Sequence, residues 1–205
     1  MWVVKLGGSL MGSPALKGWL DALVEFGDGK VVIVPGGGVF ADAVREAQKR
    51  AGISDAIAHD MALVAMDQYA TLMTGINPNL VTAASELEIA ERGWQHKAIV
   101  WKPSAMVLAD EALPKSWDLS SDSIAAWLAA KLNAQHLLIV KSIEMPYQPD
   151  LSGLVADNVV DACFSSVITN KLFNTWLLAK NDYAAITKTI SHEANPPVGW
   201  RLQAD

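Results

Sequence analysis

The first ten residues, Met1-Trp-Val-Val-Lys-Leu-Gly-Gly-Ser-Leu10, place a short apolar strand directly before a pair of glycines. Glycines have no side chain to keep a ligand away from backbone N–H groups, and Ser9 adds a hydroxyl donor. Ser13-Pro14 then supplies a helix N-cap followed by a proline suited to the first helical position. Because helix N-termini favour anions, this arrangement predicts a phosphate site, with Lys5 supplying a full positive charge. These residues alone leave a plain turn open as the alternative.

A second glycine loop follows a second strand. Apolar residues recur every three or four positions over 13–26, which predicts an amphipathic helix that Gly27 ends. Residues 31–34, Val-Val-Ile-Val, form an apolar run without alternation, typical of a strand buried in a parallel sheet. It leads into Pro35-Gly-Gly-Gly38 and a helix expected over 39–51. Ligands bind beyond the carboxyl ends of strands in open α/β sheets, so two such loops indicate one shared crevice.

The next segment, 55–74, is expected to form a helix that is apolar on most sides and largely buried. His59 lies in its first turn, where a core histidine and a ligand-binding histidine are both possible. The Gly-Ile-Asn-Pro sequence at 75–78 breaks the helix. The pattern then predicts a further helix up to about residue 92 and a strand over 98–101.

The second half begins with an irregular stretch, 103–119, which we interpret as a connection between two lobes. Trp117-Asp-Leu-Ser-Ser-Asp-Ser-Ile124 then enters a helix, with Asp122 in or near its first turn, where an aspartate ordinarily caps the helix. Residues 136–140 are expected to form a buried strand ending in Lys141-Ser142.

The C-terminal part gives a weaker pattern. It favours mostly helix over 176–190 and a short strand over 198–202.

The composition limits the kinds of partner that the protein can bind and the cell compartment in which it is expected. A formal charge of −6 and the lack of any basic run argue against nucleic-acid binding, which requires clustered Lys and Arg. The single cysteine, Cys163, excludes an intramolecular disulfide and fits a reducing compartment. No apolar run approaches the roughly 20 residues of a membrane span, and no cleavable leader is visible. We therefore expect a cytoplasmic protein, without nucleic-acid or membrane partners, that binds a small molecule.

Three motifs, in this order, resemble those of the amino acid kinase family, which includes acetylglutamate, glutamate, aspartate, uridylate and isopentenyl phosphate kinases. They are Lys5-Leu-Gly-Gly-Ser9, Pro35-Gly-Gly-Gly38 and Trp117-Asp-Leu-Ser-Ser-Asp-Ser-Ile-Ala-Ala126. The short chain and the segment His59-Asp-Met-Ala-Leu-Val-Ala-Met-Asp-Gln-Tyr69 look most like the aminomethylfuran phosphate kinase branch, which serves the biosynthesis of methanofuran-type cofactors.

The resemblance implies an α/β fold, a three-layer αβα sandwich with a mainly parallel central sheet. Residues 1–205 would form a single amino acid kinase domain, with an acceptor-binding lobe over 1–115 and a nucleotide-binding lobe over 116–205. It also implies ATP and Mg²⁺ as cofactors. We further expect a homo-oligomer.

Individual roles follow from the same resemblance. Lys5 would neutralise the transferring phosphoryl group and Asp122 would orient the catalytic lysines. Lys141 is our choice for the second catalytic lysine, with Lys171 as the alternative. The nucleotide and phosphate side would be formed by Gly7, Gly8, Ser9, Ser121 and Ser142. The acceptor side would be formed by Gly36, Gly37, Gly38 and His59. No residue is expected to ligate a metal.

The C-terminal third departs from the family pattern. After the strand at 136–140 many relatives continue with Thr-Asp and then Asp-Gly, whereas this chain has Lys141-Ser-Ile-Glu-Met-Pro146. Gly199-Trp-Arg-Leu202 is an altered counterpart of a Gly-Thr-x-Ile ending. Both changes fall on the side where the nucleotide should bind.

The expected activity is transfer of the ATP γ-phosphoryl group to a small anionic acceptor, with a phosphate monoester such as an aminomethylfuran phosphate as first choice. His59 favours phosphate, because an imidazole that donates a hydrogen bond or becomes charged offsets the repulsion between two phosphoryl groups. A carboxylate (amino acid) kinase and a catalytically silent nucleotide- or metabolite-binding protein are the alternatives. A dinucleotide-dependent enzyme is disfavoured, since no strand precedes Gly-x-Gly-x-x-Gly with an acidic residue about 20 positions later.

Overall fold

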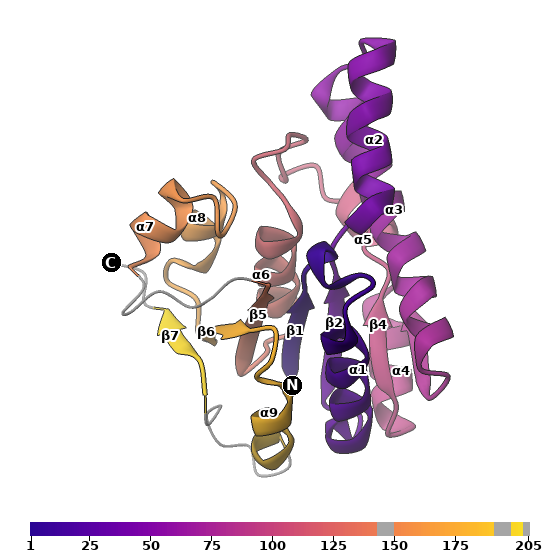
Figure 1. Cartoon of the computed structure of the whole chain (residues 1–205), viewed down its shortest axis with the longest axis vertical. Coiled ribbons are helices and arrows are strands. Elements are labelled where there is room, and N and C mark those ends of the chain that lie inside the picture. Colours follow the sequence, from indigo (N-terminus) through magenta and orange to yellow (C-terminus); the bar gives the residue numbers. More distant parts are fainter. Residues whose placement is uncertain (143–149, 191–197, 203–205) are drawn as a thin grey trace.

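The computed structural model describes residues 1–142, 150–190 and 198–202. Its strands are β1 Trp2–Leu6, β2 Val31–Pro35, β3 Leu80–Ala83, β4 Ala98–Trp101, β5 His136–Lys141, β6 Asn174–Ala179 and β7 Trp200–Leu202. They form one sheet in the order β3-β4-β2-β1-β5-β6-β7 (Figure 1). All neighbouring pairs are parallel except β6 and β7.

Helices cover both faces of this sheet. They are α1 Pro14–Gly27, α2 Gly38–Ala51, α3 Asp55–Ile76, α4 Glu86–Trp94, α5 Ser104–Leu108, α6 Ser121–Lys131, α7 Leu151–Ala156, α8 Phe164–Ile168 and α9 Tyr183–Ile190, with a 3-10 turn at Gly8–Leu10. Side chains of α1, α9 and the C-terminal half of α3 pack on one face. Side chains of α4, α5, α6, α7, α8 and the first half of α3 pack on the other. The expected αβα sandwich with a mainly parallel sheet is therefore confirmed.

The central strands explain the position of the glycine loops. In β1, Val3 packs into the core on one face while Trp2 and Val4 pack into the core on the other, and all three are fully buried. β1 lies between β2 and β5, so the chain leaves it first toward one edge of the sheet and later toward the other. The loop after β1 thus sits where the strand order reverses, the usual place for a ligand in such sheets. Both expected lobes share this sheet, and their separate roles stay a prediction.

Local sequence signals predicted the start of α1 and the end of α2 correctly. Ser13 caps α1, its Oγ accepting a hydrogen bond of 3.2 Å from the Ala15 N–H. Gly52 ends α2 in a left-handed conformation, with φ of 68°. The expected strand over 98–101 and the short final strand are also confirmed.

Two strands were not foreseen. β3 occupies the start of the stretch where helix was expected, and α4 begins only at Glu86. This edge strand has four residues and, among the described strands, pairs only with β4, so its sequence signal is short. The expectation of mostly helix over 176–190 is also wrong for its first part, because 176–179 belong to β6, which pairs with β5 and β7.

The expectation that α3 is largely buried is correct only in part. Tyr69 and Met73 are fully buried, but Ile57, Met61 and Val64 are 53%, 39% and 47% exposed. The N-terminal half of α3 lies beside α2 where both helices extend past the sheet (Figure 1). One side of this half therefore has no described element to pack against. Within the described ranges, no helix combines the length and apolarity needed to cross a membrane.

Candidate active site

The two glycine loops pack against each other at the carboxyl ends of β1 and β2. A Cβ added to Gly8 would lie 2.3 Å from the Gly38 nitrogen, and one added to Gly36 would lie 2.4 Å from the Gly8 nitrogen. Gly36 N–H donates a hydrogen bond of 2.8 Å to the Leu6 carbonyl. Gly38 also has φ of 53°, a conformation that favours glycine. The loops therefore share one crevice, as the sequence predicted.

Gly8→Ala is expected to lower the free energy of unfolding by roughly 1–3 kcal/mol, because the new methyl group must displace backbone atoms. Urea unfolding measures the change. Gly75→Ala is the matched control: its Cβ would meet nothing within 4 Å. That helical substitution should stabilise the protein by about 0.5–1 kcal/mol. If Gly8→Ala unfolds at the midpoint of the parent protein, the loops do not touch as described.

Three charged side chains from three elements meet beside the first loop. Asp122, in the first turn of α6, forms an ion pair with Lys5 of β1, its Oδ1 lying 2.8 Å from Nζ. Its Oδ2 accepts a hydrogen bond of 2.6 Å from the Nζ of Lys141, at the end of β5. All three are largely buried, with side-chain exposures of 4%, 5% and 16% for Asp122, Lys5 and Lys141. The carboxylate of Asp122 thus holds both lysines together.

This lysine–aspartate cluster carries one more positive than negative charge. Burial alone would raise the pKa of Asp122, but the two adjacent ammonium groups outweigh it and hold that pKa below its usual value. Burial, together with the charge of Lys5, lowers the pKa of Lys141 to about 8. A Cβ on Gly7 would lie 3.6 Å from the Lys5 Nζ, so the surplus charge lies next to the loop. Such a site is built to hold an anion.

The alternative second lysine, Lys171, lies away from the lysine–aspartate cluster. It is exposed in the turn before β6, at the end of the sheet opposite to the carboxyl end of β5. Ser142 lies at the correct end: its Oγ donates a hydrogen bond of 2.8 Å to the Ser9 Oγ and so joins β5 to the first loop. The altered stretch over 143–149 lies outside the described residues.

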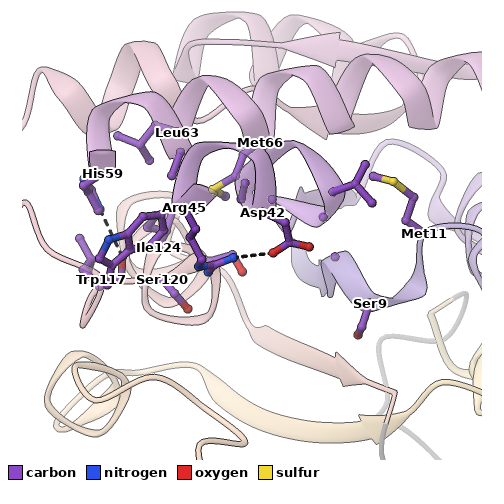
Figure 2. A pocket seen from close by; sticks show the side chains of 18 residues that line it. Ser9, Met11, Asp42, Arg45, His59, Leu63, Met66, Trp117, Ser120 and Ile124 are labelled. Carbon is purple, nitrogen blue, oxygen red and sulfur yellow. Dashed lines mark hydrogen bonds and ion pairs between the residues drawn. The ribbon is translucent and has the colours of Figure 1, made fainter. Parts of the chain in front are cut away.

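A cavity of about 470 Å³ opens beside the glycine loops. Its polar lining includes Ser9, Arg45, His59 and Ser121. Its apolar lining includes Met11, Leu63, Met66 and Ile124. Ser9 and Met11 lie toward one end of the pocket, and His59 and Trp117 lie toward the other (Figure 2).

The predicted loop residues divide around this cavity. Gly8, Gly37 and Gly38 line it, whereas Gly36 packs behind them against Gly8. Ser121, expected on the nucleotide side, lines the same cavity as the acceptor residues. The first glycine loop therefore connects the cavity to the lysine–aspartate cluster.

His59 is 4% exposed, and its Nε2 lies 3.2 Å from the carbonyl oxygen of Leu119. Because a carbonyl only accepts, Nε2 carries the proton in this contact. Burial lowers the pKa of His59, which favours the neutral ring. A neutral ring does not support the part of the argument in which a charged His59 offsets the repulsion between two phosphoryl groups, and the Nε2 proton is directed at Leu119. The role of His59 in binding the acceptor stays a prediction. In the structure the ring holds the Leu119 carbonyl by a hydrogen bond.

Arg45 was missed by the sequence analysis. Its guanidinium lies 4.6 Å from the centre of the Trp117 ring and donates a hydrogen bond of 2.8 Å to Asp42 (Figure 2). All three side chains line the cavity. Helical spacing was the available signal, because Gly38, Asp42 and Arg45 are four and three residues apart and so share one face of α2.

Residues 1–145 match the family model of the amino acid kinase family. The chain belongs to this family of phosphotransferases. A curated relative, a (5-(aminomethyl)furan-3-yl)methyl phosphate kinase from Methanocaldococcus jannaschii, is 28% identical over 169 residues, which cover 79% of this chain and 74% of the relative.

Solved structures show the same fold. The uridylate kinase from Archaeoglobus fulgidus has a TM-score of 0.71 at 17% identity, covering 98% of this chain and 99% of its own. The UMP kinase from Bacillus anthracis has a TM-score of 0.68 at 11% identity, covering 98% of each chain. That from Ureaplasma parvum has a TM-score of 0.65 at 14% identity, with 98% and 97% covered.

Proposed function

We propose that this protein is an ATP-dependent kinase whose acceptor is a small phosphate monoester, such as an aminomethylfuran phosphate. The observation that carries the proposal is the buried cluster of Lys5, Asp122 and Lys141, with its surplus positive charge beside a glycine loop. A structural core rarely retains two lysines around one carboxylate, since buried charges need compensation. An anionic substrate supplies that compensation.

The proposed reaction needs little covalent help from the protein. An oxygen of the acceptor phosphate forms a bond to the γ-phosphorus, and the bond to the oxygen bridging the β- and γ-phosphates breaks, releasing ADP. Negative charge spreads over the equatorial oxygens during transfer. Lys5, Lys141 and the loop N–H groups stabilise this charge by their fixed positions. No general base is required, because a phosphate monoester is already ionised at neutral pH.

Mg²⁺ would enter with the nucleotide. The described residues include no group of three or more His, Cys, Asp or Glu side chains that could hold a metal. Mg²⁺ suits such a protein, since it keeps several waters and binds through substrate phosphates with one or two carboxylates. When bound it would neutralise phosphate charge, while Asp122 remains engaged by the two lysines.

The shape and charge of the cavity support the acceptor class. Arg45 is the one lysine or arginine side chain among the described residues that line it, and it can pair with an anion. Trp117 and the apolar wall suit a planar ring, and the carboxylate of Asp42 suits an amine. An aminomethylfuran phosphate combines phosphate, ring and amine, and the curated relative is named for it.

Mass spectrometry of the products tests this proposal. The purified protein would be incubated with ATP, Mg²⁺ and, separately, an aminomethylfuran phosphate, an isoprenoid phosphate, UMP and a panel of amino acids. A diphosphate formed from the furan compound is the expected product. An acyl phosphate formed from an amino acid, with no diphosphate, would establish the carboxylate kinase instead. ATP binding without any transfer would establish the silent binder.

Assembly and location stay predictions. We infer a homo-oligomer located in the cytoplasm. Sedimentation velocity at several protein concentrations would show the oligomeric state, and fractionation of cells would show the compartment.

A further inference from the structure

Asp161 lies in the connection between α7 and α8, far along the chain from the proposed catalytic residues. Its Oδ2 accepts hydrogen bonds from the Ser120 N–H at 3.1 Å, the Ser120 hydroxyl at 2.7 Å and the Ser123 N–H at 3.0 Å. Its Oδ1 accepts a further hydrogen bond from the Ser123 hydroxyl. Four donors at the start of α6 therefore converge on one carboxylate.

This carboxylate replaces the local cap of α6. Ser120 occupies the N-cap position, but its side chain makes no capping bond, and Asp161 receives the N–H groups instead. A negative charge is favourable at a helix N-terminus, and charge-assisted hydrogen bonds are the stronger kind. Asp122 lies between the two serines that Asp161 holds. Asp161 therefore holds the turn from which Asp122 contacts its two lysines.

The segment that contains Asp161 also contacts the stretch before α6 at a second point. Cys163 N–H donates a hydrogen bond of 3.2 Å to the Asp118 carbonyl. On the other side of this stretch, the Leu119 carbonyl faces His59. Within residues 118–123, Leu119, Ser120 and Ser121 line the cavity. The stretch that carries Asp122 is therefore hydrogen-bonded both to the segment of Asp161 and to His59.

Asp161 also acts through its charge. Among the described residues, the charged groups that act on Lys141 are Asp122 of α6, Lys5 of β1 and Asp161. Lys5 and burial lower the pKa of Lys141, whereas the two carboxylates raise it. Asp161 therefore helps to keep the Lys141 ammonium charged.

We propose that Asp161 is a positioning residue for phosphoryl transfer, which fixes the first turn of α6 and thereby the place of Asp122 beside Lys5 and Lys141. The proposal rests on the proposed kinase activity. It predicts a loss of rate without a matching loss of substrate binding, since Asp161 acts through Asp122 and Lys141.

The test compares Asp161→Asn with the parent enzyme. We expect kcat to fall at least about tenfold while the KM values for ATP and acceptor change less than about threefold. Asp150→Asn is the matched control: Asp150 caps α7 by accepting a 3.0 Å hydrogen bond from the Ser152 N–H, and α7 carries no proposed site residue. Its kcat should equal that of the parent. Equal kcat for Asp161→Asn and Asp150→Asn would overturn the proposal.

Two further measurements separate positioning from general stability. Ser123→Ala removes one donor and keeps the carboxylate, so it should slow turnover less than Asp161→Asn, and the double variant should be no slower than Asp161→Asn alone. If the loss of rate in the double variant equals the product of the losses in the two single variants, the two residues act independently, and this result would contradict the proposal. If Asp161→Asn folds poorly, Ser123→Ala alone tests the proposal: its kcat should fall while its KM values stay near those of the parent, and an unchanged kcat would contradict the proposal.

The pH dependence of the rate is a measurement that would stay unchanged if Asp161 were only a helix cap. Lys141 is charged below its pKa, so the rate should fall as pH rises through about 8 in the parent and at lower pH in Asp161→Asn. Titration of the Lys141 ¹³Cε signal by NMR follows the same shift without any activity. If the parent transfers no phosphoryl group, the kinase proposal fails, and an NMR pKa for Lys141 that is unchanged in Asp161→Asn would overturn this inference separately.

Discussion

Lys5→Met is expected to lower kcat at least about a hundredfold, the usual cost of removing a preorganised charge that faces a transition state. The Lys5 ammonium lies beside Gly7 and is held by Asp122, so it needs no rearrangement when negative charge develops. Methionine preserves most of the side-chain volume and removes only the charge. The variant should stay folded, because Asp122 keeps its hydrogen bond to Lys141. Steady-state kinetics at saturating ATP and acceptor measure the effect.

Lys171→Met is the matched control for this experiment. It makes the same chemical change on an exposed lysine at the opposite end of the sheet. Turnover should stay within about twofold of the parent. A Lys5→Met enzyme with full turnover would show that the buried lysine is structural, and a Lys171→Met enzyme with strongly reduced turnover would restore the alternative that the geometry disfavours.

Local sequence was sufficient to predict the centre of this fold. The short apolar run over 31–34 and the glycine loops describe strands buried on both faces that end at a crevice, and each of these signals lies within ten residues. The N-cap at Ser13 and the stop at Gly52 are similarly local. Lys5 and Asp122 could be named as site residues because each lies inside a short motif.

Contacts between distant segments could not be predicted in the same way. The first part of β6 is an apolar run that fits a helix or a strand equally well, and its pairing with β5 and β7 decides the outcome. Asp161 lies 41 residues from Ser120 in a stretch without a motif, so only the folded chain shows that it caps α6. Periodicity alone also overstated the burial of α3, because an apolar side chain such as Ile57 is buried only where a neighbour covers it.

Asp122→Asn is expected to affect both catalysis and stability. Asparagine keeps the shape of the side chain but removes the only carboxylate that contacts Lys5 and Lys141 among the described residues. Two ammonium groups then remain close together in a buried site. We expect kcat to fall at least about a hundredfold, since neither lysine is held in place. We also expect a loss of roughly 3 kcal/mol in the free energy of unfolding at pH 7, the cost of breaking a buried ion pair.

The pH dependence of that stability loss identifies its cause. The folded-state pKa of Lys141 already lies near 8, below its usual value, and loss of Asp122 lowers it further. Between its folded and unfolded pKa values, Lys141 binds more protons in the unfolded chain, so the free energy of unfolding rises with pH. In Asp122→Asn this rise begins at a lower pH than in the parent, and the variant therefore recovers part of its stability before the parent begins to gain. The deficit of Asp122→Asn should therefore be larger at pH 7 than at pH 9 in urea unfolding. Asp118→Asn, an exposed change four residues earlier in the chain, should show no such dependence. A deficit that is equal at both pH values would mean that Asp122 does not control the charge of Lys141.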